Sequence, residues 1–297
     1  MKMHEGELTL SRETIQALLA AQCPQYAALP LSEKDYGGTM NHIYRLGEDK
    51  LLRLPRMPGD KTLEKEIRWI NHLQPQFEVR FPAPLFVGAP TETYPCVWAV
   101  FDWIPGTPCG EMTTDEEISL ARELAAFVNT LHALPVPEEA PRAGRKPLAV
   151  LYEETKQAIE ECRPFYTEPA EETAVCALWE EAMHIPVWDG QRRFIHADLL
   201  KTNILQENGR LQAILDFGSV GAGDPAMDLT PAWTVFGPAG RAEFRSLLSY
   251  DEAYWQRARA YALHQALLII PYYVHSYPEF TAMALNTVRQ ILQDTAE

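Results

Sequence analysis

A Pro-Gly-Thr-Pro run at residues 105–108 divides this sequence into two parts of different character. Two prolines and a glycine within four residues interrupt both helices and strands, so neither kind of element continues through them. Short apolar runs between turn residues precede the break, and long stretches with helical spacing follow it. We therefore predict two lobes, an N-terminal one over residues 1–105 and a C-terminal one over residues 106–297.

The N-terminal part is predicted to be small and β-rich. Residues 42–56 contain two strand-like runs around the turn Gly47-Glu48-Asp49-Lys50, which is typical of a hairpin. Two more strand-like runs follow at 84–88 and 96–104. Between them, residues 60–73 predict a helix, because their apolar side chains recur at spacings of three and four: Leu63, Ile67, Ile70 and Leu73.

The C-terminal part is predicted to be larger and mainly helical. Thr114-Asp115-Glu116-Glu117 has the form of a capping box, and the apolar residues between 118 and 131 share one helix face. The stretch 148–185 is helical in composition, short β-runs and loops occupy 193–225, and helices return to the end of the chain. The sequence thus predicts an α+β fold, with the break between the lobes as the place where a cleft forms.

Composition narrows the classes of partner. The chain is 46% apolar, which is ordinary for a globular protein, and its formal net charge is −15. Binding to DNA or RNA requires a basic surface that neutralises phosphates, so this charge argues against a nucleic-acid partner. A small cationic molecule, in contrast, is attracted by an acidic surface.

The sequence also bears on the compartment. Its first residues carry charges throughout and lack the apolar core of a signal peptide. The longest apolar stretch, Ala266 to Val274, contains Pro271 and is shorter than the roughly 20 residues of a membrane-spanning helix. We expect it to be buried in the protein, with no membrane partner. Five cysteines without a CxxC pair or zinc spacing predict free thiols and a cytoplasmic location.

The chemistry is concentrated in residues 192–229. His196 and Asp198 are followed by Asn203, five residues after Asp198, and by Asp216-Phe217-Gly218, where Asp216 is 18 residues after Asp198. An Asn-Gly turn within 207–210 predicts a hairpin that brings Asn203 and Asp216 to the same end. Two oxygen donors beside a third carboxylate suit Mg²⁺, which leaves Asp198 to orient a hydroxyl. Phosphoryl transfer needs little beyond such positioning and charge stabilisation.

This pattern of HxDxxxxN followed by DFG resembles the catalytic and metal loops of protein-kinase-like folds. The version here is most similar to the aminoglycoside phosphotransferase and choline kinase branch, because Gly223-Asp224-Pro225 with Asp228-Leu229 closes it and an A-P-E element is missing from the sequence. The resemblance extends from about residue 30 to the end. It implies a bilobal protein-kinase-like fold, in which a small β-rich N-terminal lobe binds nucleotide and a larger, mainly helical C-terminal lobe carries catalysis and the acceptor.

The resemblance also implies roles for single residues. Asp198 is the catalytic aspartate near the acceptor hydroxyl, as a general base or an orienting group. Asn203 and Asp216 are the Mg²⁺ ligands. His196 is a structural residue of the loop, and Asp228 braces the loop by hydrogen bonds. Asp and Asn are also common in turns, and the functional interpretation of the first three residues rests on several matches at the correct offsets.

The nucleotide is ATP or GTP, between which the sequence leaves the choice open. Gly38 and Thr39 belong to the loop that covers the phosphates, and the complete G-x-G-x-x-G and P-loop patterns are absent from the sequence. The resemblance implies that Glu66, in the helix predicted over residues 60–73 and close to Glu64, is the acid of the nucleotide site. Arg53 falls where the family has a lysine that pairs with this acid and with the phosphates. Three further residues complete the expected contacts: Asp102 and Ile104 of the hinge run, and Lys201, which either reaches the γ-phosphate or is solvated.

The acceptor is expected to bind in the C-terminal lobe. Residues 138–190 carry twelve acidic and five basic residues, including four adjacent glutamate pairs. Such pairs either line an electronegative cleft for a polycationic aminoglycoside or form a solvated helix face. The late aromatic residues similarly either shape an acceptor pocket or pack the core: Trp233, Phe236, Tyr254, Trp255, Tyr272 and Tyr273.

Three interpretations of the function remain at this stage. The first is an ATP- or GTP-dependent kinase of an antibiotic or amino-sugar hydroxyl, similar to aminoglycoside phosphotransferases. The second is a kinase of the same fold that acts on choline, ethanolamine, homoserine, a thioribose or a macrolide. The third is a pseudokinase that binds nucleotide without turnover, which the Arg53 departure keeps open. The sequence does not decide between a monomer and a dimer.

Overall fold

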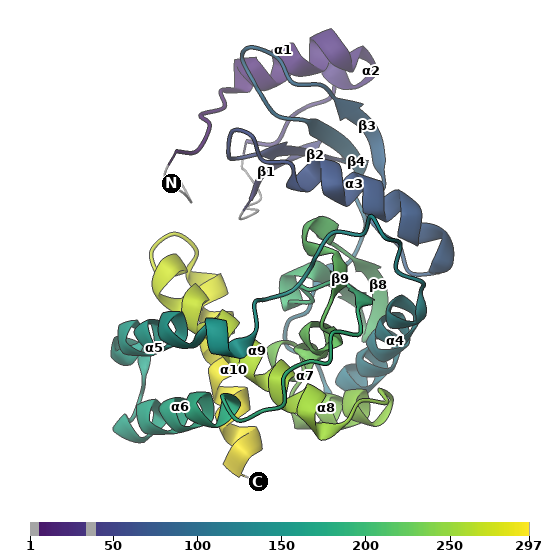
Figure 1. Cartoon of the computed structure of the whole chain (residues 1–297). Helices are drawn as coiled ribbons and strands as arrows, with labels where there is room; N and C mark the ends of the chain where they lie inside the picture. Colours follow the sequence, from purple (N-terminus) through teal and green to yellow (C-terminus); the bar gives the residue numbers. More distant parts are fainter. Residues whose placement is uncertain (1–5, 34–39, 297) are drawn as a thin grey trace. The chain divides into compact units, whose positions relative to one another are not determined.

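The computed structural model of this chain describes residues 6–33 and 40–296 (Figure 1). The chain forms two compact units. The first unit comprises the residues up to Gly106 together with Ala213–Gly218, and the second comprises Thr107–Gln212 and Ser219–Glu297. The predicted α+β class is confirmed.

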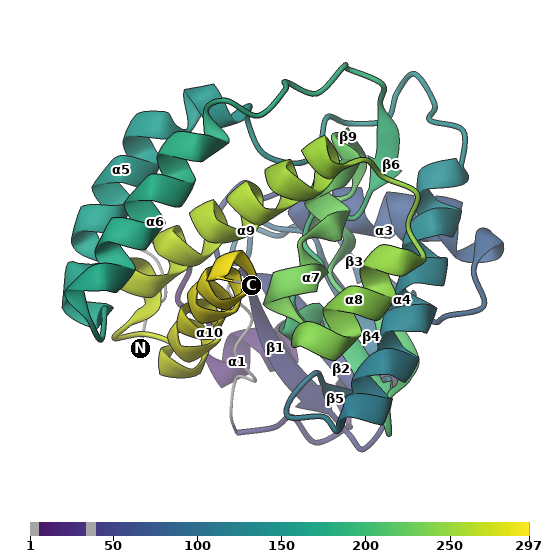
Figure 2. The ribbon, with the colours of Figure 1, turned by 90° about the horizontal axis from the view of Figure 1, so that it is seen from below.

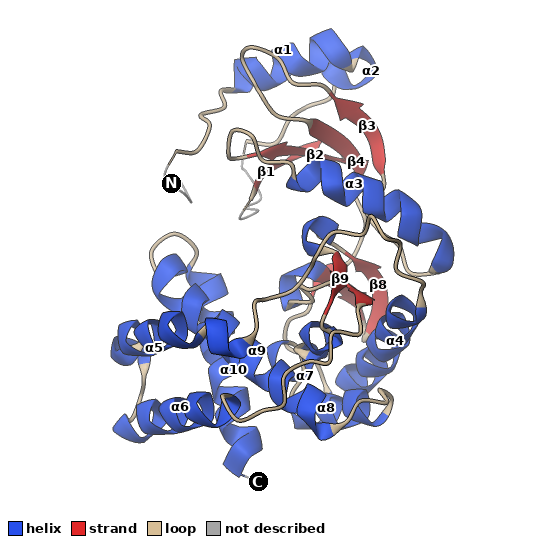
Figure 3. Ribbon diagram, in the orientation of Figure 1, coloured by secondary structure: helices blue, strands red, loops and turns tan. Residues whose placement is uncertain are grey.

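The first unit is built on one antiparallel sheet of four strands in the order β1-β2-β4-β3 (Figure 3). The predicted hairpin is confirmed, with its turn between β1 and β2. The bounds of the strands are β1 Asn41–Leu46, β2 Lys50–Pro55, β3 Pro84–Gly88 and β4 Trp98–Asp102.

Helices cover this sheet on both faces, because apolar residues alternate along its central strands. Leu52 and Val100 belong to the core cluster of α1 (Arg12–Gln22), which the short α2 (Pro24–Ala27) follows. Ala99 and Phe101 instead share a cluster with Leu63 of α3, Thr62–Leu73, the helix expected from residues 60–73.

The second unit is mainly helical, with two small sheets among its helices. One sheet has the order β5-β7-β8 and the other pairs β6 with β9. The strands are β5 Thr107–Pro108, β6 Arg193–Ile195, β7 Ile204–Glu207, β8 Arg210–Ile214 and β9 Gly221–Gly223. The predicted turn between β7 and β8 is present, with Asn208 and Gly209 at φ values of 51° and 73°, as a tight hairpin turn requires.

The helices of the second unit form two groups. In one, α4 packs on α8, where Arg122 and Glu243 form an ion pair of 2.7 Å. In the other, α5 and α6 lie side by side and pack on α9, which also packs on α10 (Figure 2). Their bounds are α4 Thr114–Ala133, α5 Tyr152–Glu161, α6 Pro169–Ala182, α7 Pro231–Thr234, α8 Pro238–Ser246, α9 Glu252–Tyr273 and α10 Pro278–Ala296.

The expected start of α4 is wrong by one residue. Thr113, not Thr114, is the N-cap, and its side chain accepts a hydrogen bond from the Glu116 backbone N–H. The Glu116 carboxylate accepts in return from the Thr113 N–H at 2.8 Å. Both Thr-x-x-Glu runs satisfy the pattern, and the extended backbone of Thr113 selects the first.

The apolar stretch 266–274 belongs to α9, where Ala266, Leu267 and Ile270 are buried. Within the described ranges, no helix combines the length and the hydropathy that crossing a bilayer requires.

A buried histidine joins the helices of the second group. His264 of α9 is 1% exposed, its Nδ1 lies 2.8 Å from the Thr155 hydroxyl of α5, and its ring stacks on Trp179 of α6. The Thr155 hydroxyl donates to the Leu151 carbonyl, so Nδ1 carries the proton that joins the two side chains. Burial, aided by the nearby Arg145, lowers the pKa of His264 to about 3. His264 is therefore neutral in the folded protein.

We expect this residue to make the protein sensitive to acid. The pKa of His264 is depressed on folding, so the unfolded chain binds more protons below its ordinary value of about 6.5. The stabilisation is complete above that value and is lost as the pH falls toward about 3. Between pH 7 and pH 5, one such histidine reduces the free energy of unfolding by about 2 kcal/mol.

Urea unfolding at the two pH values measures this loss. His264→Gln is expected to lose less stability on acidification than the wild type. The control His275→Gln, at an exposed histidine, keeps the wild-type dependence. An unchanged pH dependence in His264→Gln would contradict the assignment.

Candidate active site

In the first unit, Arg53 of β2 and Glu66 of α3 form a buried ion pair. The two guanidinium Nη atoms each lie 2.8 Å from one carboxylate oxygen of Glu66. Glu66 is fully buried, whereas the neighbouring Glu64 is exposed. Burial alone would lower the pKa of Arg53, but Glu66 and Asp216 outweigh it and raise this pKa. The pairing that the sequence suggested for Arg53 is thus present, with the fixed fork of an arginine in place of a lysine.

The Asp216-Phe217-Gly218 segment belongs to the same unit and contacts this pair. The Phe217 N–H donates to Glu66 Oε1 at 3.3 Å, and the Phe217 ring packs on Phe81 with centroids 4.3 Å apart. Asp216 has a φ of 61°, in the left-handed region, and its Oδ1 accepts from the Gly218 N–H at 3.4 Å. Glu66 therefore links the basic side chain of β2 to the segment that carries Asp216.

In the second unit, the loop after β6 carries Asp198 and is fixed by Asp228. The fully buried Asp228 carboxylate accepts from the His196 N–H at 2.8 Å and from the Ala197 N–H at 2.7 Å. It also lies 3.1 Å from His132 Nε2. Ala197 has a φ of 67°, a strained value for a residue other than glycine. The two bonds to one carboxylate hold that strained backbone in place.

Two side chains orient the Asp198 carboxylate. Oδ2 accepts from Asn203 Nδ2 at 2.9 Å, and Oδ1 accepts from Gln265 Nε2 at 3.3 Å. The Asp198 N–H also donates to His196 Nδ1 at 3.3 Å, so the proton of that ring resides on Nε2. Sequence reasoning missed Gln265, a polar residue in the apolar part of α9 that belongs to no motif.

The residues expected to hold Mg²⁺ have suitable donor atoms. The Asn203 amide NH₂ is taken up by Asp198, and among the described residues nothing bonds the Asn203 Oδ1, which is left as an oxygen donor. Asp216 supplies a carboxylate. Within residues 6–33 and 40–296, no group of three or more His, Cys, Asp or Glu is arranged to hold a metal ion. Mg²⁺ in phosphoryl-transfer sites needs only one or two such ligands besides phosphate oxygens, and each of these two side chains offers the type of oxygen that it binds.

The other predicted nucleotide contacts lie in several places. Gly38 and Thr39 are outside the described residues. Asp102 ends β4, and its carboxylate pairs with Lys50 at 3.2 Å. Lys50 and Arg53 both belong to β2, but they pair with different carboxylates. Ile104 follows as a buried residue. Lys201, in the second unit, begins the short helical turn that ends at Asn203.

The acidic pairs of residues 153–181 lie on α5 and α6, and several have partners on their own surface. Glu172 pairs with Arg163 at 2.7 Å, and Glu180 accepts from the Tyr152 hydroxyl at 2.7 Å. Half of the late aromatic residues pack the core instead: Trp233, Phe236 and Trp255 are buried. Tyr254 and Tyr273 are half-buried, and Tyr272 is exposed. These contacts favour the helix-face interpretation for the glutamates that make them.

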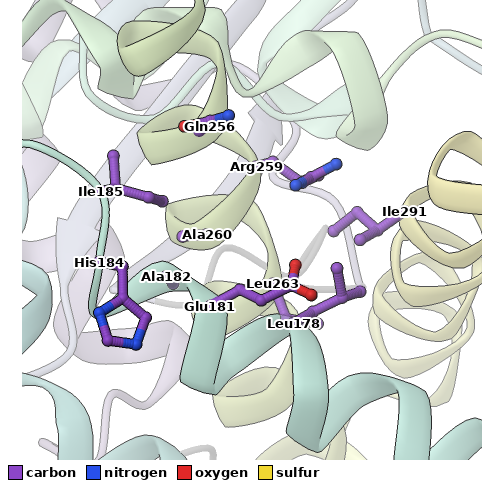
Figure 4. A pocket seen from close by; sticks show the side chains of 10 residues that line it. All are labelled: Leu178, Glu181, Ala182, His184, Ile185, Gln256, Arg259, Ala260, Leu263 and Ile291. Atoms are coloured by element: carbon purple, nitrogen blue, oxygen red, sulfur yellow. The ribbon is translucent and has the colours of Figure 1, made fainter.

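Figure 4 shows a pocket between α6 and α9, which Ile291 of α10 borders. Its walls carry one carboxylate, Glu181, and one guanidinium, Arg259. The pocket measures about 150 Å³, whereas sites for drug-sized ligands measure roughly 300–1,000 Å³. It is therefore too small to hold an aminoglycoside.

We expect Asp228→Asn to destabilise the protein. An amide accepts through one oxygen only, so one of the two loop N–H groups faces an NH₂ group and loses its partner. Leaving a buried donor unpaired, together with the loss of the charged acceptor, reduces the free energy of unfolding by about 2–4 kcal/mol.

Urea unfolding measures this change. Asp115→Asn, which removes the same charge from an exposed position of α4, is the control and is expected to stay near the wild type. Equal stability of the two variants would show that the loop does not depend on Asp228.

Comparison with proteins of known structure places the fold. The chain is similar to aminoglycoside 2'-phosphotransferase-IIIa in its GDP complex, with 17% identity, a TM-score of 0.71 and coverage of 96% of this chain and 100% of that chain. It is also similar to the macrolide 2'-phosphotransferase MphH from Brachybacterium faecium, with 19% identity, a TM-score of 0.55 and coverage of 93% and 97%. A third similar structure is a thermostable mutant of aminoglycoside phosphotransferase APH(4)-Ia with ADP and hygromycin B, with 16% identity, a TM-score of 0.59 and coverage of 92% and 97%.

These similarities confirm the predicted kinase-like fold. No curated protein matched the chain. The profile of the phosphotransferase enzyme family, in contrast, matches residues 35–261, a span that includes Arg53, Glu66, Asp198, Asn203 and Asp216. The match covers most of the sequence, and the resemblance inferred from the motifs is confirmed. The chain belongs to the phosphotransferase enzyme family.

Proposed function

We propose that this protein is a kinase that transfers the γ-phosphate of ATP or GTP to a hydroxyl group of a small-molecule acceptor. The observation that carries the proposal is the setting of Asp198: both of its carboxylate oxygens accept hydrogen bonds from side-chain amides, on a loop that Asp228 braces. A carboxylate held in this way is directed, as an aspartate that receives a hydroxyl proton must be. The five free cysteines support a cytoplasmic location.

The proposed roles follow the chemistry of transfer. As the acceptor oxygen forms its bond to phosphorus, the bond from phosphorus to the leaving oxygen breaks and the hydroxyl proton passes to Asp198. Asn203 and Asp216 would hold Mg²⁺, which when bound neutralises charge on the phosphate oxygens. His196 and Asp228 hold the conformation of the loop. His196 accepts a hydrogen bond from the Asp198 N–H, and Asp228 accepts one from the His196 N–H.

For the nucleotide, we propose Arg53 as the main cationic contact in the N-terminal lobe, residues 1–105. Glu66 fixes the direction of the Arg53 guanidinium. The Nε of Arg53 has no hydrogen-bond partner among the described residues. The remaining nucleotide contacts are proposed from the family resemblance alone: Gly38, Thr39, Asp102, Ile104 and Lys201. The C-terminal lobe, residues 106–297, would bind the acceptor.

The acceptor that we propose is an aminoglycoside-like molecule. Two observations support it: the acidic surplus of residues 138–190 and the aminoglycoside kinases among the proteins of similar fold. A macrolide or a metabolic alcohol is the second candidate, because several of those glutamates have local partners and a macrolide kinase has the same fold. A nucleotide-binding protein without turnover is the remaining alternative.

Asp198→Asn tests the catalytic assignment. Loss of the group that receives the proton is expected to reduce the transfer rate by roughly 10²–10⁴-fold. Nucleotide affinity is expected to change little, because Asp198 is not among the proposed nucleotide contacts and asparagine keeps the size of its side chain. Transfer from ATP and GTP is measured with Mg²⁺ on a panel of aminoglycosides, macrolides and metabolic alcohols.

Asp189→Asn, at an exposed aspartate of the same unit, is the matched control. Full transfer by Asp198→Asn would refute the assignment. No transfer by the wild type to any acceptor, with nucleotide-dependent thermal stabilisation, would favour the non-catalytic alternative.

Two variants test Arg53 by separating its effect on nucleotide binding from its effect on stability. Arg53→Ala removes a charged donor and is expected to raise the nucleotide KM by roughly 10–100-fold. It also leaves the buried Glu66 without its cationic partner, which destabilises the protein by about 3–5 kcal/mol. The double variant Arg53→Met, Glu66→Leu removes both charges and is expected to regain much of the stability without the nucleotide affinity. Steady-state kinetics and urea unfolding give the two readouts, and a normal KM in the double variant would exclude Arg53 from the site.

A further inference from the structure

The second unit contains a cavity of about 570 Å³ whose charge is opposite to that of the whole chain. Its walls come from residues 142–149, from the segment that follows α6, from β9 and from α9. The charged residues in these walls are five cations and one anion: Arg142, Arg145, Lys146, Arg192 and Arg257, with Asp224. Asp198 is not among the lining residues, although the charges of Asp198 and Glu154 act on Arg145 from outside the cavity.

Two sets of contacts fix these walls. Residues 141–143 lie along β9, where the Ala222 N–H donates to the Pro141 carbonyl at 2.7 Å. This approach needs glycine in β9, because a Cβ at Gly223 would come within 2.4 Å of the Ala143 carbonyl oxygen. Arg257 binds Asp224 at 2.9 Å and also donates to the Pro186 carbonyl at 3.2 Å, so it ties α9 to two other walls. Arg257 and Asp224 thereby neutralise each other.

Arg145 is different, because no described residue forms a hydrogen bond or an ion pair with it. Its side chain is half-buried and its Nε is fully buried. The indole N–H of Trp188, in the part of the lining that follows α6, is buried and lacks a partner in the same way. Buried donors in folded proteins are nearly always paired, and an unpaired charged one costs several kcal/mol. Both donors in the wall of this cavity are therefore available to an acceptor that enters it.

The rest of the lining shows what surrounds that acceptor. Leu148, Met183, Ile185 and Pro186 are apolar, and Trp188 and Tyr261 add aromatic surface. A volume of about 570 Å³ lies within the range of sites for small organic molecules, roughly 300–1,000 Å³. A planar guanidinium matches a carboxylate with two parallel hydrogen bonds.

We propose that this cavity binds a small organic carboxylate with an apolar body, and that Arg145 recognises the carboxylate. Lys146, Arg142 and Arg192 add an attractive field at the rim, where all three are exposed. Trp188, Tyr261 and Leu148 contact the apolar body. The site needs neither nucleotide nor acceptor, and it does not depend on the proposed function.

The test uses three probes with one aromatic body and different charges: 2-naphthoate, 2-naphthylmethanol and 2-naphthylmethylamine. Their Kd values for the full-length protein are measured by isothermal titration calorimetry at neutral pH, without nucleotide. The anion is expected to bind at least tenfold more tightly than the alcohol, and the amine more weakly than both. Equal affinities of the anion and the alcohol would overturn the proposal.

Variants locate the binding. Arg145→Gln is expected to weaken 2-naphthoate by roughly 10–100-fold and to leave the alcohol nearly unchanged. Arg163→Gln, at an arginine that is 63% exposed and pairs with Glu172 outside the cavity, is the matched control and should bind as the wild type does. Unchanged naphthoate binding in Arg145→Gln would refute the role of Arg145.

A folding defect is separated from a loss of recognition by a conservative variant. Arg145→Lys keeps the positive charge but loses the planar fork, so it should keep the preference for the anion with an intermediate affinity. Thermal unfolding of each variant verifies the fold. If Arg145→Lys folds and binds 2-naphthoate and 2-naphthylmethanol equally well, the proposal fails, even if Arg145→Gln is unstable.

Discussion

One buried carboxylate holds the loop on which the proposed chemistry of this protein depends. Asp228 receives two adjacent backbone N–H groups, those of His196 and Ala197, and thereby stabilises a left-handed residue that would otherwise relax. His132 contacts the same carboxylate and is itself held by the Tyr250 hydroxyl at 2.6 Å. The direction of Asp198 is thus determined by a chain of polar contacts that extends from α4 to the residues before α9. The precision of the site comes from the core of the second unit.

The net charge suggests attraction of cations, but the distribution of charge over the chain differs from one site to another. A formal value of −15 describes the whole chain, but exposed charges act over about 8 Å in physiological salt, so each site responds to its own neighbours. The glutamates of α5 and α6 are largely exposed, and some bind arginine or tyrosine nearby. Five cationic side chains, in contrast, line the cavity around Arg145. An acidic protein can therefore attract cations at long range and still select an anion within one cavity.

The sequence predicted features that depend on neighbours along the chain. The hairpins, α3 and the Asn-Gly turn follow from local patterns, and the pairing of Arg53 with Glu66 follows from a motif whose offsets are regular. Gln265 and Arg145 could not be found in this way, because their partners or surroundings come from distant segments and neither belongs to a pattern. The cap of α4 was misplaced because two overlapping runs satisfy the same rule, and backbone geometry chooses between them.

The first unit consists of two separate stretches of chain, and this has a consequence for recombination between relatives. Residues 213–218 belong to it although residues 107–212, about a third of the sequence, separate them from the first stretch. Phe217 packs on Phe81 and its N–H donates to Glu66, so the residues that receive it, its socket, lie far upstream in the sequence. A chimera joined only near residue 106 would combine the socket of one parent with the phenylalanine segment of the other. A recombinant that receives the whole first unit from one parent must take both stretches from that parent. Exchange of the unit therefore requires crossovers on both sides of residues 213–218 in addition to the one near residue 106.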